Sequence, residues 1–263
     1  MTTNTKPTVA VHKFSSCDGC QLAFLNPDMD LLKLNDLVNI KHFAEAGLTN
    51  ENARVDVAFI EGSISTNKER ERIQTIRNNT KTLITIGACA TTGGIQALRN
   101  IRDTKTWIKD IYAQPDYIDS LETATPVAEH VRVDFELWGC PINSRQVVTL
   151  LRSLLMGVTP ADDTEKVCME CKRNQTVCTL VTKQEPCLGP VTRAGCGAIC
   201  PQFGRDCYAC YGPPKDSNTN ALANRLAGLG LLPEEIARRF QLFNNNAPIF
   251  RNIARKQTEQ RND

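Results

Sequence analysis

Residues 82–89, with the sequence Thr-Leu-Ile-Thr-Ile-Gly-Ala-Cys, decide how the first part of the chain folds. The first five form an uncharged run rich in β-branched side chains, which predicts a buried strand, and Gly87 marks its end. Stretches of the same character occur at Thr8–Phe14, Val55–Ile60 and Val131–Leu137. The sequence therefore predicts four strands, and Cys89 comes directly after one of them.

Segments with helical spacing of their apolar residues alternate with these strands, at 31–38, 68–78 and 146–156. Such alternation predicts an α/β fold with a parallel sheet that helices cover on both faces. Ligands of these sheets bind beyond the carboxyl ends of the strands. Because Cys17, Cys89 and Cys140 each follow a predicted strand, we expect them to meet at one edge of the sheet.

The composition argues against two classes of partner. A formal net charge of +2 over 263 residues gives no strongly basic face, so we expect neither nucleic-acid nor membrane-surface binding. Residues 1–7 show no apolar signal region or twin-arginine pair, and the least charged stretch, 82–98, is interrupted by glycines. We therefore expect a cytoplasmic protein without membrane insertion. The length suits an α/β domain, 1–160, and a smaller appended domain, 161–263.

Twelve cysteines are the most informative feature of the composition. Four are spread over the first 140 residues, and eight crowd between Cys168 and Cys210, ahead of a helical tail at 221–250. The cytosol keeps thiols reduced, and exposed thiols without a ligand oxidise. This distribution predicts metal or cluster ligation, with disulfides and inert core thiols as the alternatives. The cysteine-rich segment has no periodicity, so it needs a cross-link or a metal to fold.

The N-terminal set of cysteines is Cys17-x-x-Cys20, Cys89 and Cys140-Pro141. A CxxC pair places two thiolates on one tight loop, and two more from neighbouring strand ends complete a Cys₄ shell. The glycines of Gly87–Gly94 let backbone amides approach such a centre. A nucleotide-binding turn is the alternative for this stretch, but it lacks the Lys of a phosphate loop and the spacing of a dinucleotide fingerprint.

The C-terminal set supplies enough ligands for two further centres. In order it is Cys168, Cys171, Cys178, Cys187, Cys196, Cys200, Cys207 and Cys210. Sequential grouping in fours is the simplest assignment, although two-cluster ferredoxins exchange one ligand between clusters. A Cys₄ zinc ribbon built from the two CxxC pairs is the alternative, and it would leave four of these cysteines unexplained.

Other polar residues offer weaker candidates. His12 lies inside a predicted strand, where a packed or hydrogen-bonded role is expected rather than a catalytic one. Glu61 ends another strand, so it either relays protons or orients a loop, and we favour the second. No serine or cysteine nucleophile has a paired base.

Several longer stretches carry a family resemblance. They are Ser16-Cys-Asp-Gly-Cys-Gln21, Phe59-Ile-Glu-Gly-Ser63, Gly87-Ala-Cys-Ala90 with Gly93-Gly94, Gly139-Cys-Pro141, Cys168-x2-Cys171, and the most specific, Glu185-Pro-Cys-Leu-Gly-Pro-Val-Thr-Arg-Ala-Gly-Cys196, which continues to Ile199-Cys-Pro201. On these stretches, which span about residues 9–214, the chain resembles the small (delta) subunits of cytoplasmic NAD(P)-linked NiFe hydrogenases, also called sulfhydrogenases.

The resemblance implies a flavodoxin-like domain over 1–160 with a proximal [4Fe–4S] cluster, and a domain over 161–263 with two more clusters and a helical tail. The implied ligands are Cys17, Cys20, Cys89 and Cys140 for the proximal cluster, Cys196, Cys200, Cys207 and Cys210 for the medial cluster, and Cys168, Cys171, Cys178 and Cys187 for the distal cluster. Membrane-linked relatives carry a His at one distal position and a Pro at one medial position. This chain has Cys at both of these positions, as expected of the cytoplasmic branch.

The resemblance also implies partners. The NiFe centre would lie on a separate large subunit, and electrons from H₂ would pass reversibly through three clusters to an iron–sulfur and flavin module that reduces NAD(P)⁺. The chain would thus serve as a hydrogenase subunit without catalytic residues of its own. One alternative is a small subunit that serves a heterodisulfide-reductase or deazaflavin partner. Another is a zinc-stabilised interaction module with no redox role.

Overall fold

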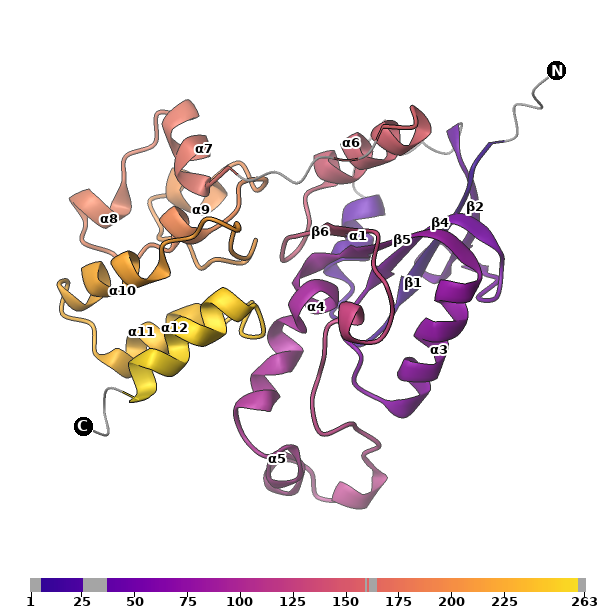
Figure 1. Cartoon of the computed structure of the whole chain (residues 1–263), viewed down its shortest axis with the longest axis horizontal. Coiled ribbons are helices and arrows are strands. Elements are labelled where there is room, and N and C mark those ends of the chain that lie inside the picture. The colour runs from indigo at the N-terminus through magenta and orange to yellow at the C-terminus, as the bar shows by residue number, and fades with distance from the viewer. Residues whose placement is uncertain (1–5, 26–36, 159, 161–164, 260–263) are drawn as a thin grey trace. The chain divides into compact units, whose positions relative to one another are not determined.

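The computed structural model describes residues 6–25, 37–158, 160 and 165–259. The chain divides into two compact units, Met1–Pro160 and Ala161–Asp263. The first unit contains an open β-sheet with helices, and the second is built from helices and their connecting loops (Figure 1).

Six strands form one sheet in the first unit, in the order β3-β2-β1-β4-β5-β6. Their bounds are β1 (Thr8–Lys13), β2 (Asn39–Phe43), β3 (Leu48–Thr49), β4 (Val55–Glu61), β5 (Thr80–Ile86) and β6 (Phe135–Leu137). All neighbouring pairs are parallel except β2 with β3, which is antiparallel at the edge. When β3 is left out, the order is β2-β1-β4-β5-β6. Renumbered along the chain, these five strands have the order 2-1-3-4-5, as in flavodoxin-like sheets. The predicted fold class is confirmed.

Helices cover both faces of this sheet. Phe59 and Ile60, neighbours on β4, point to opposite faces, and both are completely buried. On the Phe59 face lie α1 (Gly19–Leu25) and α6 (Ser144–Leu155), and on the Ile60 face lies α3 (Asn67–Asn78) (Figure 1). The strands are buried on both sides, as their continuous apolar runs predict.

The structure departs from the expectation at three strands, β2, β3 and β6. The predicted strand Val131–Leu137 forms only over Phe135–Leu137, because the carboxylate of Asp134 accepts the hydrogen bond from the Leu83 N–H at 2.8 Å, where a regular strand would present its backbone carbonyl. Strand β2 was not predicted, since its exposed Asn39 and Lys41 leave no continuous apolar run. Most of the predicted helix 31–38 lies outside the described residues.

Short helices connect β5 to β6. Their bounds are α4 (Gly87–Thr92), η2 (Gly94–Ile101), α5 (Thr104–Ile111), η3 (Pro115–Tyr117) and η4 (Val127–Glu129), and a further turn, η1 (Ala44–Ala46), lies between β2 and β3. Asp103 caps α5, because its carboxylate accepts a hydrogen bond from the Thr106 N–H at 2.8 Å.

The described part of the second unit consists of helices joined by loops. The cysteine-rich segment forms α7 (Val167–Arg173), α8 (Thr179–Thr182), η5 (Gly189–Val191) and α9 (Ile199–Gln202), followed by α10 (Thr219–Ala227), α11 (Pro233–Gln241) and α12 (Pro248–Glu259). The last three helices bury Leu226, Ile236 and Phe250, and the cysteine-rich segment adds Leu188 and Val191 to that core. In the described part of the chain, no helix has the length and apolar character needed to cross a bilayer.

Candidate functional site

The carboxyl edge of the sheet carries four cysteines. Cys17 follows β1 and is exposed, while Cys20 lies on α1 and is buried. Cys89 lies on α4 directly after β5, and Cys140 follows β6; both are half-buried. The Ala88 N–H donates to the Gly139 carbonyl at 2.7 Å, which joins the loops that carry these last two cysteines. The structure thus brings together the four residues that the sequence places at strand ends.

These four thiols lie close enough for the charge of one to shift the pKa of another. Burial, followed by the charges of Cys140 and Cys17, raises the pKa of the Cys89 thiol to about 12. Burial, followed by the charge of Cys17, raises the pKa of Cys140 to about 11. Burial also raises the pKa of Cys20, with the charges of Glu61, Cys89 and Cys140 as smaller causes. Thiolates are disfavoured here unless a cationic centre compensates them, and metal ligands must be thiolates.

At two positions near the cysteines, only glycine leaves enough space for the neighbouring sulfur atom. A Cβ atom on Gly94 would lie 2.7 Å from the Cys89 Sγ, and one on Gly87 would collide with the Cys20 Sγ. Both glycines have a positive φ, 57° and 82° respectively, which disfavours any other residue. The backbone at this edge therefore fits sulfur atoms that converge on a common centre.

Hydrogen-bond donors and acceptors surround the same sulfur atoms. The backbone of Ile142 hydrogen-bonds the Cys20 sulfur, and that of Ile95 hydrogen-bonds the Cys89 sulfur, in each case partly offsetting the effect of burial on the thiol pKa. The Cys89 thiol donates to the Gln96 Oε1 at 3.0 Å. Backbone amides directed at sulfur are the means by which proteins stabilise and tune iron–sulfur centres.

Glu61 orients the CxxC loop, as favoured from the sequence. Its carboxylate, 2% exposed at the end of β4, accepts a hydrogen bond from the Cys20 N–H at 3.0 Å. Burial raises the pKa of Glu61, and the bond from Cys20 opposes that rise. The side chain thus fixes the start of α1 relative to the sheet.

In the second unit, the first four cysteines of the segment lie near one another. Burial and then the charges of Cys168, Cys187 and Cys178 raise the pKa of the Cys171 thiol to about 11. A Cβ atom on Gly189 would lie 3.4 Å from the Cys187 Sγ and 3.6 Å from the Cys168 Sγ. Cys178 is exposed, so this group reaches the surface of the unit.

The last four cysteines adjoin that group. Burial raises the pKa of the Cys196 thiol, with the charges of Glu170 and Cys200 as smaller causes, and burial raises the pKa of the Cys207 thiol, with the charges of Cys187 and Cys210 as smaller causes. The Cys207 N–H also donates to the Cys187 Sγ at 3.3 Å. The two groups are therefore adjacent, and the contacts do not divide the eight thiols into two separate sets.

All twelve cysteines are free thiols, with no disulfide between them. Among the described residues, which include every cysteine, no three His, Cys, Asp or Glu side chains come close enough together to hold one metal ion.

The remaining candidate behaves as the sequence predicts. His12 is 2% exposed and stacks on His42, with 4.5 Å between the ring centroids. It therefore has a packing role under α3. Two polar residues beside the cysteines were missed, Gln96 and Glu170. An acid between two cysteines, in Cys168-Met-Glu-Cys171, was the signal for Glu170, because it adds negative charge where thiolates already repel one another.

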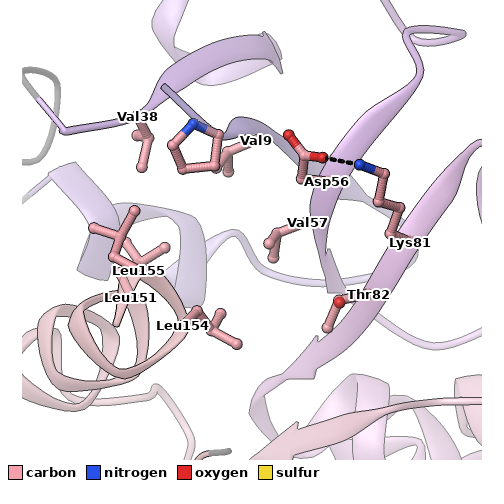
Figure 2. Close-up of a pocket in the computed structure, with 10 residues that line it drawn as sticks. Val9, Val38, Asp56, Val57, Lys81, Thr82, Leu151, Leu154 and Leu155 are labelled. Atoms are coloured by element: carbon pink, nitrogen blue, oxygen red, sulfur yellow. Dashed lines mark hydrogen bonds and ion pairs between the residues drawn. The ribbon is translucent and has the colours of Figure 1, made fainter. Parts of the chain in front are cut away.

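A pocket of about 300 Å³ lies at the opposite end of the sheet from Cys17 and its partners (Figure 2). Val9, Val57 and the leucines at 151, 154 and 155 line it, and an ion pair between Asp56 and Lys81, 2.7 Å apart, lies at its side (Figure 2). None of its lining residues is a cysteine, so its chemistry differs from that of the cysteine edge.

In this chain a flavodoxin-like sheet with four thiols at its carboxyl edge is followed by a unit with eight more. Residues 17–154 match the family described as NADH ubiquinone oxidoreductase, 20 Kd subunit. Sulfhydrogenase 2 subunit delta of Pyrococcus furiosus is 35% identical over 235 residues, which are 89% of this chain and 98% of that protein. A subunit of the F420-non-reducing hydrogenase vhu of Methanocaldococcus jannaschii is 28% identical over 90% of this chain and 93% of its own length.

A solved structure agrees with these relatives. A chain of an NAD⁺-reducing [NiFe]-hydrogenase in the H₂-reduced state has a TM-score of 0.55 and 27% identity, covering 60% of this chain and 95% of that one. The chain belongs to the 20-kDa subunit family and, within it, to the small subunits of NiFe hydrogenases of the sulfhydrogenase and NAD-reducing kind. The predicted family is confirmed, and its members are subunits of oxidoreductases that act on hydrogen.

Proposed function

We propose that the chain is the electron-relay subunit of a NiFe hydrogenase, with three [4Fe–4S] clusters bound to its twelve cysteines. The observation that carries the proposal is the meeting of Cys17, Cys20, Cys89 and Cys140 at the carboxyl edge of the sheet. When bound, such clusters accept and release single electrons. The residues of this chain hold, orient and shield these centres.

The ligand assignment follows the family resemblance. The cluster on Cys17, Cys20, Cys89 and Cys140 is the proximal one, held by residues 1–160. Residues 161–263 hold the medial cluster on Cys196, Cys200, Cys207 and Cys210 and the distal cluster on Cys168, Cys171, Cys178 and Cys187. Cys171 lies near the other three distal ligands and also near Cys196, and Cys207 lies near both Cys187 and Cys210, so the division into two clusters rests on the resemblance.

The relay needs a partner at each end. On the proximal side the partner is the large subunit with the NiFe centre, which cleaves or forms H₂. On the distal side we propose an iron–sulfur and flavin module that reduces NAD(P)⁺, which the relation to an NAD⁺-reducing hydrogenase supports. Twelve reduced thiols suit the cytoplasm, which we propose as the compartment.

Exposed apolar side chains near Cys178 support a docking face for that distal partner. Val177, Val181 and Phe203 are 67%, 69% and 79% exposed. The Lys183 Nζ donates to the Gly204 carbonyl at 2.6 Å, which holds α8 beside the loop after α9. The exposed charged residues between 167 and 205, a fully described stretch, are all cationic: Lys172, Arg173, Lys183 and Arg205. An apolar face with a cationic rim fits an acidic face on the iron–sulfur and flavin module.

A heterodisulfide-reductase or deazaflavin partner is the second candidate on the distal side. The relation to the F420-non-reducing hydrogenase of Methanocaldococcus jannaschii, which aligns over 93% of that protein, favours the heterodisulfide-reductase partner over the deazaflavin partner, because that enzyme does not reduce the deazaflavin F420. The two candidates use the same clusters and differ in the acceptor. Identification of the subunits that co-purify with the native protein separates them.

The substitution Cys89→Ser tests the relay. It removes one proximal ligand on α4, so the variant complex should lose the proximal cluster and H₂-dependent NAD(P)⁺ reduction. Diaphorase activity of the flavin module, which does not need this chain's proximal centre, should survive. Wild-type rates of H₂-dependent reduction in the variant would contradict the relay.

A further inference from the structure

The side chain of Glu170 connects the two cysteine groups of the second unit. Glu170 lies on α7 between Cys168 and Cys171, yet its carboxylate reaches the loop around Cys196. Its Oε1 accepts hydrogen bonds from the N–H groups of Gly195 at 2.9 Å and Gly197 at 3.0 Å. Its Oε2 accepts a third, from Ala198, at 3.2 Å. One carboxylate therefore binds three of four consecutive backbone amides.

This loop has a backbone that needs such support. Ala198 adopts the left-handed conformation with φ 55°, which residues other than glycine rarely adopt. Successive amides that converge on one point form a concave anion-binding site, and the resident anion here is the Glu170 carboxylate. From the other side, the Asn174 Nδ2 and the Gln202 Nε2 donate to the Gly197 carbonyl at 2.9 Å and 2.5 Å.

The carboxylate also lies beside the Cys196 sulfur itself. The distance from the Cys196 Sγ to the Glu170 Oε2 is 3.8 Å. Glu165, near the start of α7, instead has a cation as its partner, because Arg173 lies 2.7 Å from its carboxylate. The charge of Glu170 is thus directed at one cysteine, and the groups that compensate it are backbone amides.

We propose that Glu170 is a positioning residue that shapes the Cys196 loop and makes the centre bound there harder to reduce. The proposal rests on the proposed function, since it presumes an iron–sulfur centre at Cys196. A negative charge a few ångströms from a ligand sulfur disfavours the additional electron of the reduced centre. Because Glu170 extends from the helix that carries Cys168 and Cys171, the same side chain also sets the separation of the two ligand loops.

The test uses the anaerobically purified complex and redox titrations followed by electron paramagnetic resonance. Glu170→Gln keeps the length of the side chain and one carbonyl acceptor but removes the charge. We expect one of the three centres to shift to a more positive potential, with the other two and the iron content unchanged. Glu165→Gln, an exposed acid close by, is the matched control and should shift none.

A second substitution separates charge from position. Glu170→Asp keeps the charge and shortens the reach, so we expect a loss of iron from one centre without a positive shift in the centres that remain. Unchanged potentials in Glu170→Gln, or an equal shift of all three centres, would overturn the inference. Wild-type protein without iron would instead refute the proposed function, so the two failures are distinguishable.

Discussion

The carboxylate of Glu61 accepts a hydrogen bond from the backbone N–H of Cys20 at 3.0 Å, inside the sheet edge where the four N-terminal cysteines meet. Glu61 ends β4, and Cys20 opens α1 after β1, so this bond joins the two central strands at the switch point of the sheet. Open α/β sheets bind their ligands at this point. The bond therefore fixes the CxxC loop where the fold provides a binding site.

Replacement of Glu61 by Ala should destabilise the first unit. The Cys20 N–H would be left buried without a partner, which costs about 1–3 kcal/mol. Thermal unfolding should occur at lower temperature and the iron content should fall, whereas Glu61→Gln keeps an acceptor and should retain both. Glu122→Ala, at an exposed site, serves as the control. An unchanged melting temperature in Glu61→Ala would refute this role.

Addition of one methyl group at Gly94 should remove the proximal centre. The new Cβ would lie 2.7 Å from the Cys89 Sγ and 2.8 Å from the Cys89 Cα, so Cys89 and its sulfur must move. Iron analysis should show a loss of about one third, as expected for one of three clusters. Gly47→Ala is the matched control, since Gly47 also has a positive φ, 78°, but has open space around its Cβ position. Wild-type iron content in Gly94→Ala would contradict this prediction, and an equal loss of iron in Gly47→Ala would show that backbone strain, rather than contact with Cys89, causes the loss.

The buried His12 predicts loss of stability in mild acid. Burial and then the charges of His42 and Arg72 lower the pKa of His12 to about 3. Below its ordinary pKa of about 6.5, the unfolded chain binds a proton that the folded chain does not, so stability falls as pH decreases from 6.5 toward 3. The slope should be about 1.4 kcal/mol per pH unit from this residue.

Urea unfolding of the full protein between pH 5.5 and 7.5 measures this slope. His12→Phe keeps an aromatic ring against His42 but has no proton to bind, so its stability should depend less steeply on pH. Equal slopes in the variant and the wild type would mean that the pair of histidines does not control acid stability.

Removal of the exposed ring of Phe203 should weaken binding of the electron-accepting module. The side chain is 79% exposed beside cationic residues, as expected of an interface anchor, and loss of one anchor weakens binding about tenfold. Phe203→Ser should therefore raise the dissociation constant while the iron content stays constant. Tyr117→Ser, 82% exposed in the first unit, should leave this binding unchanged.

Much of this architecture was predictable because local patterns carry it. The apolar runs of β1, β4 and β5 and the positions of Cys17, Cys89 and Cys140 after strands are direct readings of the sequence. In contrast, β2 and the short β6 depend on tertiary context, since Asp134 pairs with Leu83 through its side chain. No periodicity encodes such a contact.

The second unit shows where sequence reasoning stops. The spacing of its eight cysteines predicts ligands. The role of Glu170 as a positioning residue becomes clear only from the structure, in which the backbone amides of the loop at 195–198 bind its carboxylate. The same holds for Leu188 and Val191, which lie in an aperiodic segment and still join the helical core. Contacts between segments distant in sequence determine these roles.

Analysis of iron, acid-labile sulfide and zinc in the anaerobically purified native protein tests the central claim most directly. Three [4Fe–4S] clusters predict about twelve iron and twelve sulfide per chain, with little zinc. Colourless protein without iron, or protein with zinc in its place, would contradict the electron relay.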